Sequence, residues 1–153
     1  MTSPIKIVAT QEIIQLRHEI LRPGKPIETC FFEGDYLPTT KHLAFYENEI
    51  VVGATSLYLI NHINLNDLAT NCIQFQMRGM AISNQHQKKG IGQQLINFTE
   101  DYLKNTNIDT VFLWFNARET AVPFYEKFQY KKIGNLFEIP DVGSHYMMYK
   151  ILS

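Results

Sequence analysis

A polar loop that contains two lysines and two closely spaced glycines lies between two apolar segments, within residues 80–92. The apolar residues before it predict the end of a strand, and the periodic residues after it predict the start of a helix. Backbone N–H groups of such a loop and the positive end of the helix dipole can bind phosphate oxygens. Gly90 and Gly92 leave the backbone uncovered, while Lys88 and Lys89 either add charge or are simply solvated. The loop is therefore a candidate phosphate-binding site.

The glycine pattern of this loop differs from two common nucleotide-binding motifs. A Walker P-loop would have Gly-Lys-Ser/Thr after its glycines, and a dinucleotide fingerprint would have a third glycine. Neither feature is present. The chemistry of the loop must then be inferred from the elements that surround it.

The composition is that of an ordinary globular domain. The chain has 153 residues, of which 45% are hydrophobic and 19% charged, so we expect a single domain over residues 1–153. A formal net charge of -1 gives no basis for binding nucleic acid or an anionic membrane. Cys30 and Cys72 are too few and too far apart for a zinc site or a disulfide framework, so no metal is expected.

No apolar segment of the chain is typical of export or of membrane insertion. The first residues lack the apolar core of a signal peptide, and no apolar run is long enough to span a bilayer. We therefore expect a soluble cytoplasmic protein with reduced thiols.

The hydrophobic pattern of the first half predicts strands and one amphipathic helix. The expected order is a strand, a helix, a loop and a β-hairpin, at residues 5–8, 11–21, 25–40 and 42–59. Thr10 is a plausible N-cap for the helix. The segment at 25–40 is too polar for a core and too aromatic for a linker, so we expect a loop or a short helix that borders a pocket.

The second half predicts the remaining elements of a mixed α/β domain. After a polar surface loop at 61–71, these are a strand, a helix, a central strand, a second helix and two closing strands, at residues 72–82, 91–102, 110–115, 117–128, 130–137 and 145–152. Gly79 predicts a bulge in the first of these strands. The first of these helices is expected to be amphipathic, because its apolar residues recur at helical spacing at Ile91, Leu95, Phe98 and Tyr102.

Two blocks in this order resemble the GNAT superfamily of acetyl-CoA-dependent N-acetyltransferases. The first is Gln87-Lys88-Lys89-Gly90-Ile91-Gly92, which matches the family signature Gln/Arg-x-x-Gly-x-Gly/Ala between a bulged strand and a helix. The second is a strand that ends at Asn116, followed by a helix with Phe124 and Tyr125. The resemblance covers about residues 51–153, and the pattern around His145 is similar to that of small bacterial members. It implies a central mixed, mostly antiparallel sheet with a bulged, splayed strand pair and flanking helices.

The resemblance implies that acetyl-CoA is the cosubstrate. In the family, the loop amides bind the pyrophosphate and the bulged strand pairs with the pantetheine arm. Asn116 would bind that arm or, alternatively, cap the next helix. The residues that the resemblance assigns to coenzyme A are Met80, Ala81, Ile82, Gln87, Lys88, Lys89, Gly90, Ile91, Gly92, Gln93, Asn116, Phe124 and Tyr125.

The resemblance also implies two catalytic roles. A tyrosine at the position of Tyr125 usually protonates the leaving thiolate, and the backbone N–H of Ile82 would stabilise the oxyanion. The alternative for Tyr125 is an ordinary core aromatic residue.

The resemblance does not assign the general base. Many members have a glutamate on the bulged strand, but this chain has Gln74, Gln76 and Arg78 there. Neutral amides do not accept a proton, so the base lies elsewhere or water removes the proton. The candidates are Glu33, Asp35, Glu138 and His145, of which His145 has the most suitable unperturbed pKa or makes a structural hydrogen bond to its turn.

Arg78 and Glu33 are candidate substrate-binding residues. Arg78 is a charged residue in an apolar strand, so it either binds an acidic group of the acceptor or faces solvent. We expect an enzyme that moves an acetyl group to a primary amine of a small molecule, amino acid or peptide by direct attack in a ternary complex. The alternatives are a non-catalytic acyl-CoA-binding module and the transfer of a larger acyl group such as succinyl. Dimers are common in the superfamily, so a homodimer is a further expectation.

Overall fold

The structure is a computed structural model that describes residues 3–153, except for the side chain of Ile63. Seven strands form one sheet in the order β1-β2-β3-β4-β5-β7-β6. Their bounds are β1 (Ile5–Val8), β2 (Lys41–Glu47), β3 (Ile50–Tyr58), β4 (Ile73–Ile82), β5 (Val111–Arg118), β6 (Lys131–Ile139) and β7 (Gly143–Leu152). The β4–β5 pair is parallel and the other described pairs are antiparallel. The predicted mixed, mostly antiparallel sheet is confirmed.

The helices are short, apart from two. The α-helices are α1 (Gln11–Ile20), α2 (Ile91–Thr106) and α3 (Val122–Glu126), and the 3-10 turns are η1 (Ile27–Cys30), η2 (Ile63–Leu65), η3 (Asn84–His86) and η4 (Glu119–Ala121). The residues pack into two compact units. The first contains the residues up to Leu59 and Met77–Leu103, and the second contains Ile60–Gln76 and Lys104–Ser153.

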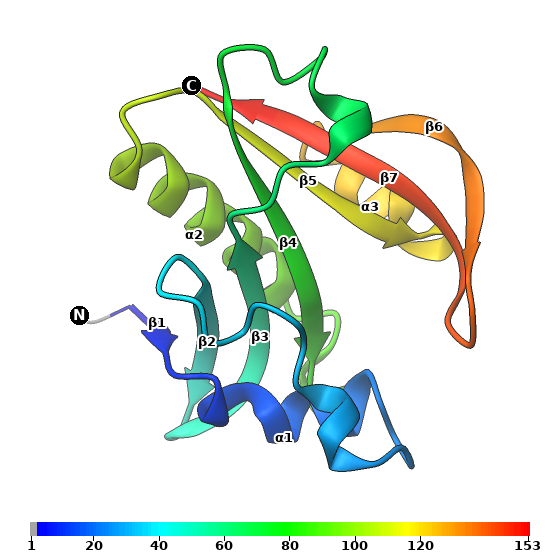
Figure 1. Cartoon of the computed structure of the whole chain (residues 1–153). Coiled ribbons are helices and arrows are strands. Elements are labelled where there is room, and N and C mark those ends of the chain that lie inside the picture. The colour runs from blue at the N-terminus through cyan, green and yellow to red at the C-terminus, as the bar shows by residue number, and fades with distance from the viewer. Residues whose placement is uncertain (1–2) are drawn as a thin grey trace. The chain divides into compact units, whose positions relative to one another are not determined.

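In the first unit, β1, β2 and β3 form an antiparallel meander (Figure 1). The turn between β2 and β3 contains Asn48 and Glu49, whose φ angles are 50° and 66°. Two consecutive residues with positive φ are what a two-residue hairpin turn requires, because this turn matches the twist of the strands. The predicted hairpin is confirmed.

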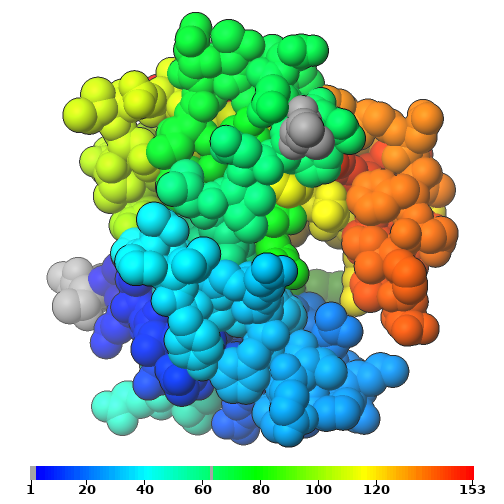
Figure 2. Space-filling model, viewed as in Figure 1, coloured from blue at the N-terminus to red at the C-terminus, as the bar shows by residue number. Residues whose placement is uncertain are grey.

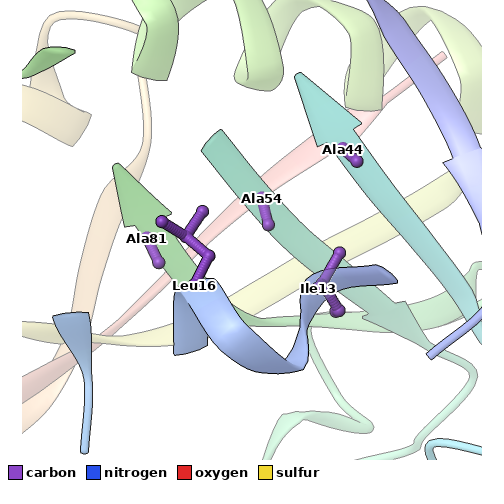
Figure 3. Close-up of a cluster of buried hydrophobic side chains, with 5 residues drawn as sticks. All are labelled: Ile13, Leu16, Ala44, Ala54 and Ala81. Atoms are coloured by element: carbon purple, nitrogen blue, oxygen red, sulfur yellow. The ribbon is translucent and has the colours of Figure 1, made fainter. Parts of the chain in front are cut away.

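Helix α1 packs its apolar side on this meander (Figure 3). Ile13 and Leu16 are buried against three alanines, Ala44 of β2, Ala54 of β3 and Ala81 of β4. Alanine side chains leave room for the helix to approach the sheet closely, so its branched side chains fill the space between them.

Helix α2 packs on the other side of β3, since successive strand residues face opposite sides. A Cβ at Gly53 would lie 2.8 Å from Cγ2 of Ile91, so the Ile91 side chain of α2 occupies the space that the absence of a Cβ at Gly53 leaves. The predicted amphipathic helix is confirmed, with Ile91 and Leu95 buried and Phe98 and Tyr102 half-buried. The helix also buries Ile96, Thr99 and Leu103.

The second unit contains β5, β7 and β6, with β7 antiparallel to both neighbours. Its core includes Phe112 and Trp114 of β5, which pack with Leu65 and Ala69. Residues 61–71 were expected to form a polar surface loop, and this is wrong at Leu65 and Ala69, which are almost fully buried. These two apolar side chains cover the face of β5 and thereby remove apolar surface from water.

The junction after β5 differs from the sequence prediction. The strand continues to Arg118, so Asn116 lies inside it, opposite Met147, and does not cap a helix. The helix expected within 117–128 is confirmed as the short α3, which follows the 3-10 turn η4. Pro123 stands at the start of α3, as expected, and its missing N–H prevents the helix from continuing further toward the N-terminus.

Candidate functional site

A side-chain amide cross-links the two ends of the predicted phosphate-binding loop. Gln87 donates from Nε2 to the carbonyl oxygen of Ile82 at 3.2 Å and to Oδ1 of Asn84 at 3.3 Å. These bonds join the loop to the end of β4 across the η3 turn. The side chain of Gln87 therefore holds the shape of the loop.

Left-handed backbone occurs twice in this loop. The φ angles of Lys88 and Gly90 are 62° and 84°. A Cβ at Gly90 would have no atom within 4 Å, so glycine is needed there for its backbone conformation, and the protein leaves this side of the loop open.

The N-terminus of α2 begins directly after this open position. The carbonyl oxygen of Gly90 accepts the N–H of Gln94 at 3.1 Å. The N–H groups of Ile91, Gly92 and Gln93 therefore lie in the first turn, where a helix provides no partner for them. Ile91 is buried beneath the helix, which anchors these groups. The aligned N–H groups could hold an anionic group of a cofactor.

The other residues of the first unit that the resemblance assigns to coenzyme A differ in exposure. Ala81 is buried against α1, so only its backbone can contact a ligand. Met80 and Ile82 are half-buried, and Lys88 and Lys89 are exposed. The two lysines have no ion-pair partner within residues 3–153.

Tyr125 lies in an aromatic cluster of the second unit. Its ring centroid is 4.4 Å from that of Phe115 and 5.2 Å from that of Phe124. Burial raises the pKa of Tyr125 to about 12, so its hydroxyl is protonated at neutral pH. Within the described part of the chain, no group hydrogen-bonds this hydroxyl. Asn116 is exposed, and Phe124 is 36% exposed.

The candidate bases His145 and Glu138 occupy adjacent positions of the β6–β7 ladder. His145 is buried, and its Nδ1 lies 2.7 Å from the carbonyl oxygen of Gly143. Since a carbonyl oxygen only accepts, Nδ1 carries the proton and Nε2 is the basic nitrogen. Glu138 is exposed and accepts a hydrogen bond from the hydroxyl of Ser144.

The candidate acceptor residues Arg78 and Glu33 both belong to the first unit. The guanidinium carbon of Arg78 lies 5.0 Å from the ring centroid of Phe32 and 5.3 Å from that of Tyr58. Glu33 is exposed in the segment after η1, and no ion pair within residues 3–153 includes it. The two residues are therefore not paired with each other.

A buried ion pair lies beneath the aromatic rings that contact Arg78. Nη1 of Arg17 is 2.7 Å from Oδ2 of Asp35, and both side chains are 0% exposed. Asp35 also accepts bonds from the Tyr58 hydroxyl at 2.5 Å and from the Phe32 N–H at 2.7 Å. Burial alone would raise the pKa of Asp35, but these hydrogen bonds and the charge of Arg17 outweigh it and hold the pKa below its usual value. Asp35 is therefore a structural anion, which argues against its role as a general base.

His42 extends this buried network without adding charge. Its Nε2 is 2.9 Å from the carbonyl oxygen of Asp35, and its Nδ1 is 2.7 Å from Oγ of Ser56. Ser56 in turn accepts a bond from Nη2 of Arg17 at 3.0 Å. Nε2 is thus the donor and Nδ1 the acceptor. Burial lowers the pKa of His42, so the ring is neutral at neutral pH.

Two sequence predictions near this network are only partly right. Thr10 is the N-cap residue of α1, as predicted, but its side chain makes no capping bond, and its hydroxyl donates to the carbonyl oxygen of Asp35 at 3.2 Å instead. The segment at 25–40 was judged too polar for a core, yet it buries Cys30, Asp35 and Thr40. Its polar groups can be buried because they are hydrogen-bonded there.

Sequence reasoning missed Arg17, His42 and Tyr58. One signal was available: Arg17 stands four residues after Ile13, on the apolar stripe of α1. A charged residue on the buried face of a helix requires a buried partner.

Within residues 3–153, no group of three or more His, Cys, Asp or Glu side chains could hold a metal ion. No helix of this part of the chain is both long enough and apolar enough to cross a membrane.

Comparison with known proteins identifies the family. Residues 27–151 match the acetyltransferase (GNAT) domain. The Bacillus subtilis (strain 168) protein YitI, described as an uncharacterized N-acetyltransferase, is 29% identical over 148 residues, which are 97% of this chain and 95% of YitI.

Solved structures share the fold. Arabidopsis thaliana NAA60 in complex with acetyl-CoA has a TM-score of 0.75 and 12% identity, and 97% of both chains are covered. An aminoglycoside 6'-N-acetyltransferase complexed with coenzyme A has a TM-score of 0.72 and 14% identity, again with 97% of both chains covered. The family match extends over most of the chain, and so the chain belongs to the GNAT family and is an N-acetyltransferase.

Proposed function

We propose that the chain transfers the acetyl group of acetyl-CoA to a primary amine of a small molecule, amino acid or peptide, by direct attack within a ternary complex. The observation that carries this proposal is the open, basic loop in front of the α2 N-terminus. In the reaction, the amine nitrogen forms a bond to the acetyl carbon and the carbon–sulfur bond breaks. The nitrogen loses a proton, and coenzyme A leaves as a thiol.

The loop and the first turn of α2 would hold the pyrophosphate of the cosubstrate. The N–H groups of Ile91, Gly92 and Gln93 supply donors, and Lys88 and Lys89 supply charge. The residues fit an anion, because both lysines are exposed without an ion-pair partner in the described chain. The backbone of Met80 and Ile82 would pair with the amides of the pantetheine arm.

Three residues of the second unit complete the cosubstrate assignment. Asn116 is proposed to hydrogen-bond the pantetheine arm, and its exposed amide supports this role. Phe124 is proposed to pack against the same arm. Tyr125 is proposed to protonate the leaving thiolate, which is supported by a neutral phenol that no described group hydrogen-bonds.

The remaining steps need an oxyanion donor and a base. The backbone N–H of Ile82 is proposed to stabilise the oxyanion of the tetrahedral intermediate. His145 is proposed as the base, acting through Nε2, because the bond from Nδ1 to Gly143 leaves that nitrogen basic. Glu138 is the second choice, since its carboxylate is exposed.

The experiment that tests the proposal measures thiol release from acetyl-CoA across a panel of primary amines. Binding of coenzyme A is measured in parallel by calorimetry. We expect binding, and release that depends on at least one amine. Binding without amine-dependent release would favour the non-catalytic acyl-CoA-binding module. Faster release from succinyl-CoA than from acetyl-CoA would favour the transfer of a larger acyl group.

A further inference from the structure

Arg78 carries a charge that no carboxylate of the described chain neutralises. The ion pairs of this unit join Asp35 to Arg17 and Glu47 to His86, with His42 close to Asp35. Arg78 is half-buried, so its charge is only partly hydrated. A partly desolvated cation without a counterion is costly to the protein and attractive to an anionic ligand.

Asp35 is the acid of this network, and it has no capacity left for Arg78. Its two oxygens accept two bonds from Arg17, one from the Tyr58 hydroxyl and one from the Phe32 N–H. Four bonds use the acceptor sites of a carboxylate. Arg17, Asp35 and Arg78 together therefore leave one positive charge, because His42 is neutral.

The backbone at Gly79 brings Arg78 to this side of the sheet. On β3, Ser56 and Tyr58 face α1, since both bond to Arg17. Gly79 of β4 faces the same side, because a Cβ there would lie 3.2 Å from Cε2 of Phe32. In a regular strand the neighbouring Arg78 would face away. Gly79 has φ of +71°, which breaks the alternation and lets the guanidinium reach Phe32 and Tyr58.

The rings that support Arg78 are held in place by the buried ion pair. The Phe32 N–H and the Tyr58 hydroxyl both bond to Asp35. The guanidinium carbon of Arg17 lies 4.0 Å from the Phe32 centroid. Figure 2 shows residues of the 25–40 segment at the molecular surface in lighter blue. The cation is thus positioned before a ligand arrives, which lowers the entropic cost of binding.

We propose that Arg78, resting on Phe32 and Tyr58, binds a carboxylate of the acceptor, so that the acceptor is an amine that also carries a carboxylate. This inference rests on the proposed function, because it names the substrate class of that reaction. The planar guanidinium donates two parallel bonds to a carboxylate, a geometry that lysine does not offer. A single excess positive charge matches a single carboxylate.

The test compares acceptors that differ only in the carboxylate. Each amino acid in the panel is assayed beside its primary amide and its decarboxylated amine, with wild-type protein, Arg78→Met and Arg78→Lys. We expect Arg78→Met to lower kcat/KM about 10- to 100-fold for amino acids, with little change for the decarboxylated amines. Arg78→Lys keeps the charge and the contact with the rings, so its kcat/KM for amino acids should lie between those of the wild-type protein and Arg78→Met. Equal losses for both acceptor classes would overturn the proposal and leave Arg78 a structural residue.

Lys6→Met is the matched control. Nζ of Lys6 lies 5.3 Å from the ring centroid of Tyr46 in the same unit, so this variant also removes one cation from an aromatic ring. We expect it to leave the preference for carboxylate acceptors unchanged. If it altered that preference as much as Arg78→Met, the effect would be one of net charge, and the proposal would fail.

A binding measurement separates this inference from the proposed function. N-acetylglycine and N-acetylglycinamide are titrated into the isotopically labelled protein with coenzyme A present, and amide shifts are followed by NMR. We expect saturable shifts with N-acetylglycine that are absent in Arg78→Met and weak with the amide. This result without any turnover would retain the anion site and reject the proposed reaction. Turnover that does not distinguish carboxylates, with no dependence of binding on Arg78, would retain the reaction and reject the site.

Discussion

Two buried side chains of this protein, Tyr125 and Asp35, differ in their protonation state at neutral pH. The phenol of Tyr125 stays neutral because no charge compensates its burial, whereas Asp35 stays ionised because four hydrogen bonds outweigh the same burial effect. The difference lies in the neighbours: aromatic rings surround Tyr125, and a guanidinium faces Asp35. A neutral phenol can donate a proton, while an ionised carboxylate whose acceptor sites are all hydrogen-bonded has only a structural role.

The first prediction at the residue scale concerns Tyr125→Phe. We expect kcat to fall about 100- to 10,000-fold, because the thiolate would leave without an acid, while coenzyme A affinity stays within about twofold. Steady-state kinetics and calorimetry measure the two effects. Tyr149→Phe is the control, since Tyr149 stacks on Phe112 in the same unit. Unchanged kcat in Tyr125→Phe would remove this residue from the mechanism.

A second prediction at this scale concerns Arg17→Met. The variant leaves Asp35 buried without its partner, so we expect the free energy of unfolding to fall by about 3–5 kcal/mol. Adding Asp35→Leu should restore part of this loss, because the unpaired charge is then absent. Urea unfolding followed by circular dichroism measures both. The exposed Gln15→Met on the same helix should change little, and similar midpoints for Arg17→Met and Gln15→Met would contradict the argument.

At the scale of elements, the junction between β4 and α2 combines a fixed loop with an open side. Gln87 ties the loop to Ile82 and Asn84, and Ile91 is buried under the start of α2. Between these anchors, Gly90 has left-handed backbone with open space beside it. The loop therefore keeps its N–H groups oriented while leaving their outer side accessible.

The prediction for this element compares Gly90→Ala with Gly24→Ala. Both glycines have positive φ, 84° and 75°, and a Cβ at either would have no atom within 4 Å. Each variant should lose about 1–2 kcal/mol of unfolding free energy, since alanine is strained in this conformation. Only Gly90→Ala should weaken coenzyme A binding, which calorimetry detects. Equal affinity in the two variants would mean that the loop does not hold the cosubstrate.

Local patterns predicted the order of most elements, and pairing between distant residues was beyond them. The hairpin between β2 and β3 and the start of α2 could be predicted, because turn residues and helical spacing are recognisable within a short stretch of sequence. The Arg17–Asp35 pair joins residues 18 positions apart, and the bond from Arg17 to Tyr58 spans 41. No period of 2 or 3.6 residues encodes such contacts. The family resemblance, by contrast, depended on short runs of adjacent residues and on the order of the elements around them.

The same limit applies within the candidate site. Gln87 and Gly90 could be predicted because the loop is one continuous stretch, bounded by β4 and α2. The surroundings of Arg78 could not, because Phe32 and Tyr58 come from two other parts of the chain. Whether a strand arginine faces solvent or an aromatic surface is decided by the backbone at Gly79, and its φ angle is a tertiary feature.

At the scale of the whole molecule, buried ionisable groups set the pH range in which the protein is stable. The pKa of His42 and the pKa of Asp35 are both lowered in the folded state. A group of this kind contributes stability above its unfolded pKa and loses it as the pH falls through its folded pKa. The free energy of unfolding should therefore decline below about pH 6.5 as His42 becomes charged in the unfolded chain, and more steeply below about pH 4 as Asp35 becomes protonated there.

At alkaline pH the relevant pKa values are raised in the folded state, so stability is lost as the pH rises. Burial raises the pKa of Tyr58 and of Tyr125 to about 12, compared with about 10 for an unfolded tyrosine. The folded state then retains protons that the unfolded chain loses, so both contributions are complete below about pH 10 and disappear as the pH rises to about 12. Each difference corresponds to about 3 kcal/mol of unfolding free energy.

We therefore expect stability to fall between about pH 10 and pH 12, and we expect Tyr125→Phe to remove about half of this fall. Tyr125 is the better substitution, because Tyr58→Phe would also delete the bond to Asp35. Urea unfolding at a series of pH values measures the effect, and tyrosinate absorbance of the native protein reports the ionisation directly. Tyr36→Phe is the control, since Tyr36 is 64% exposed. If every tyrosine of the native protein ionised near pH 10, or if Tyr125→Phe and the wild-type protein lost stability in parallel, the buried phenol would not be the cause.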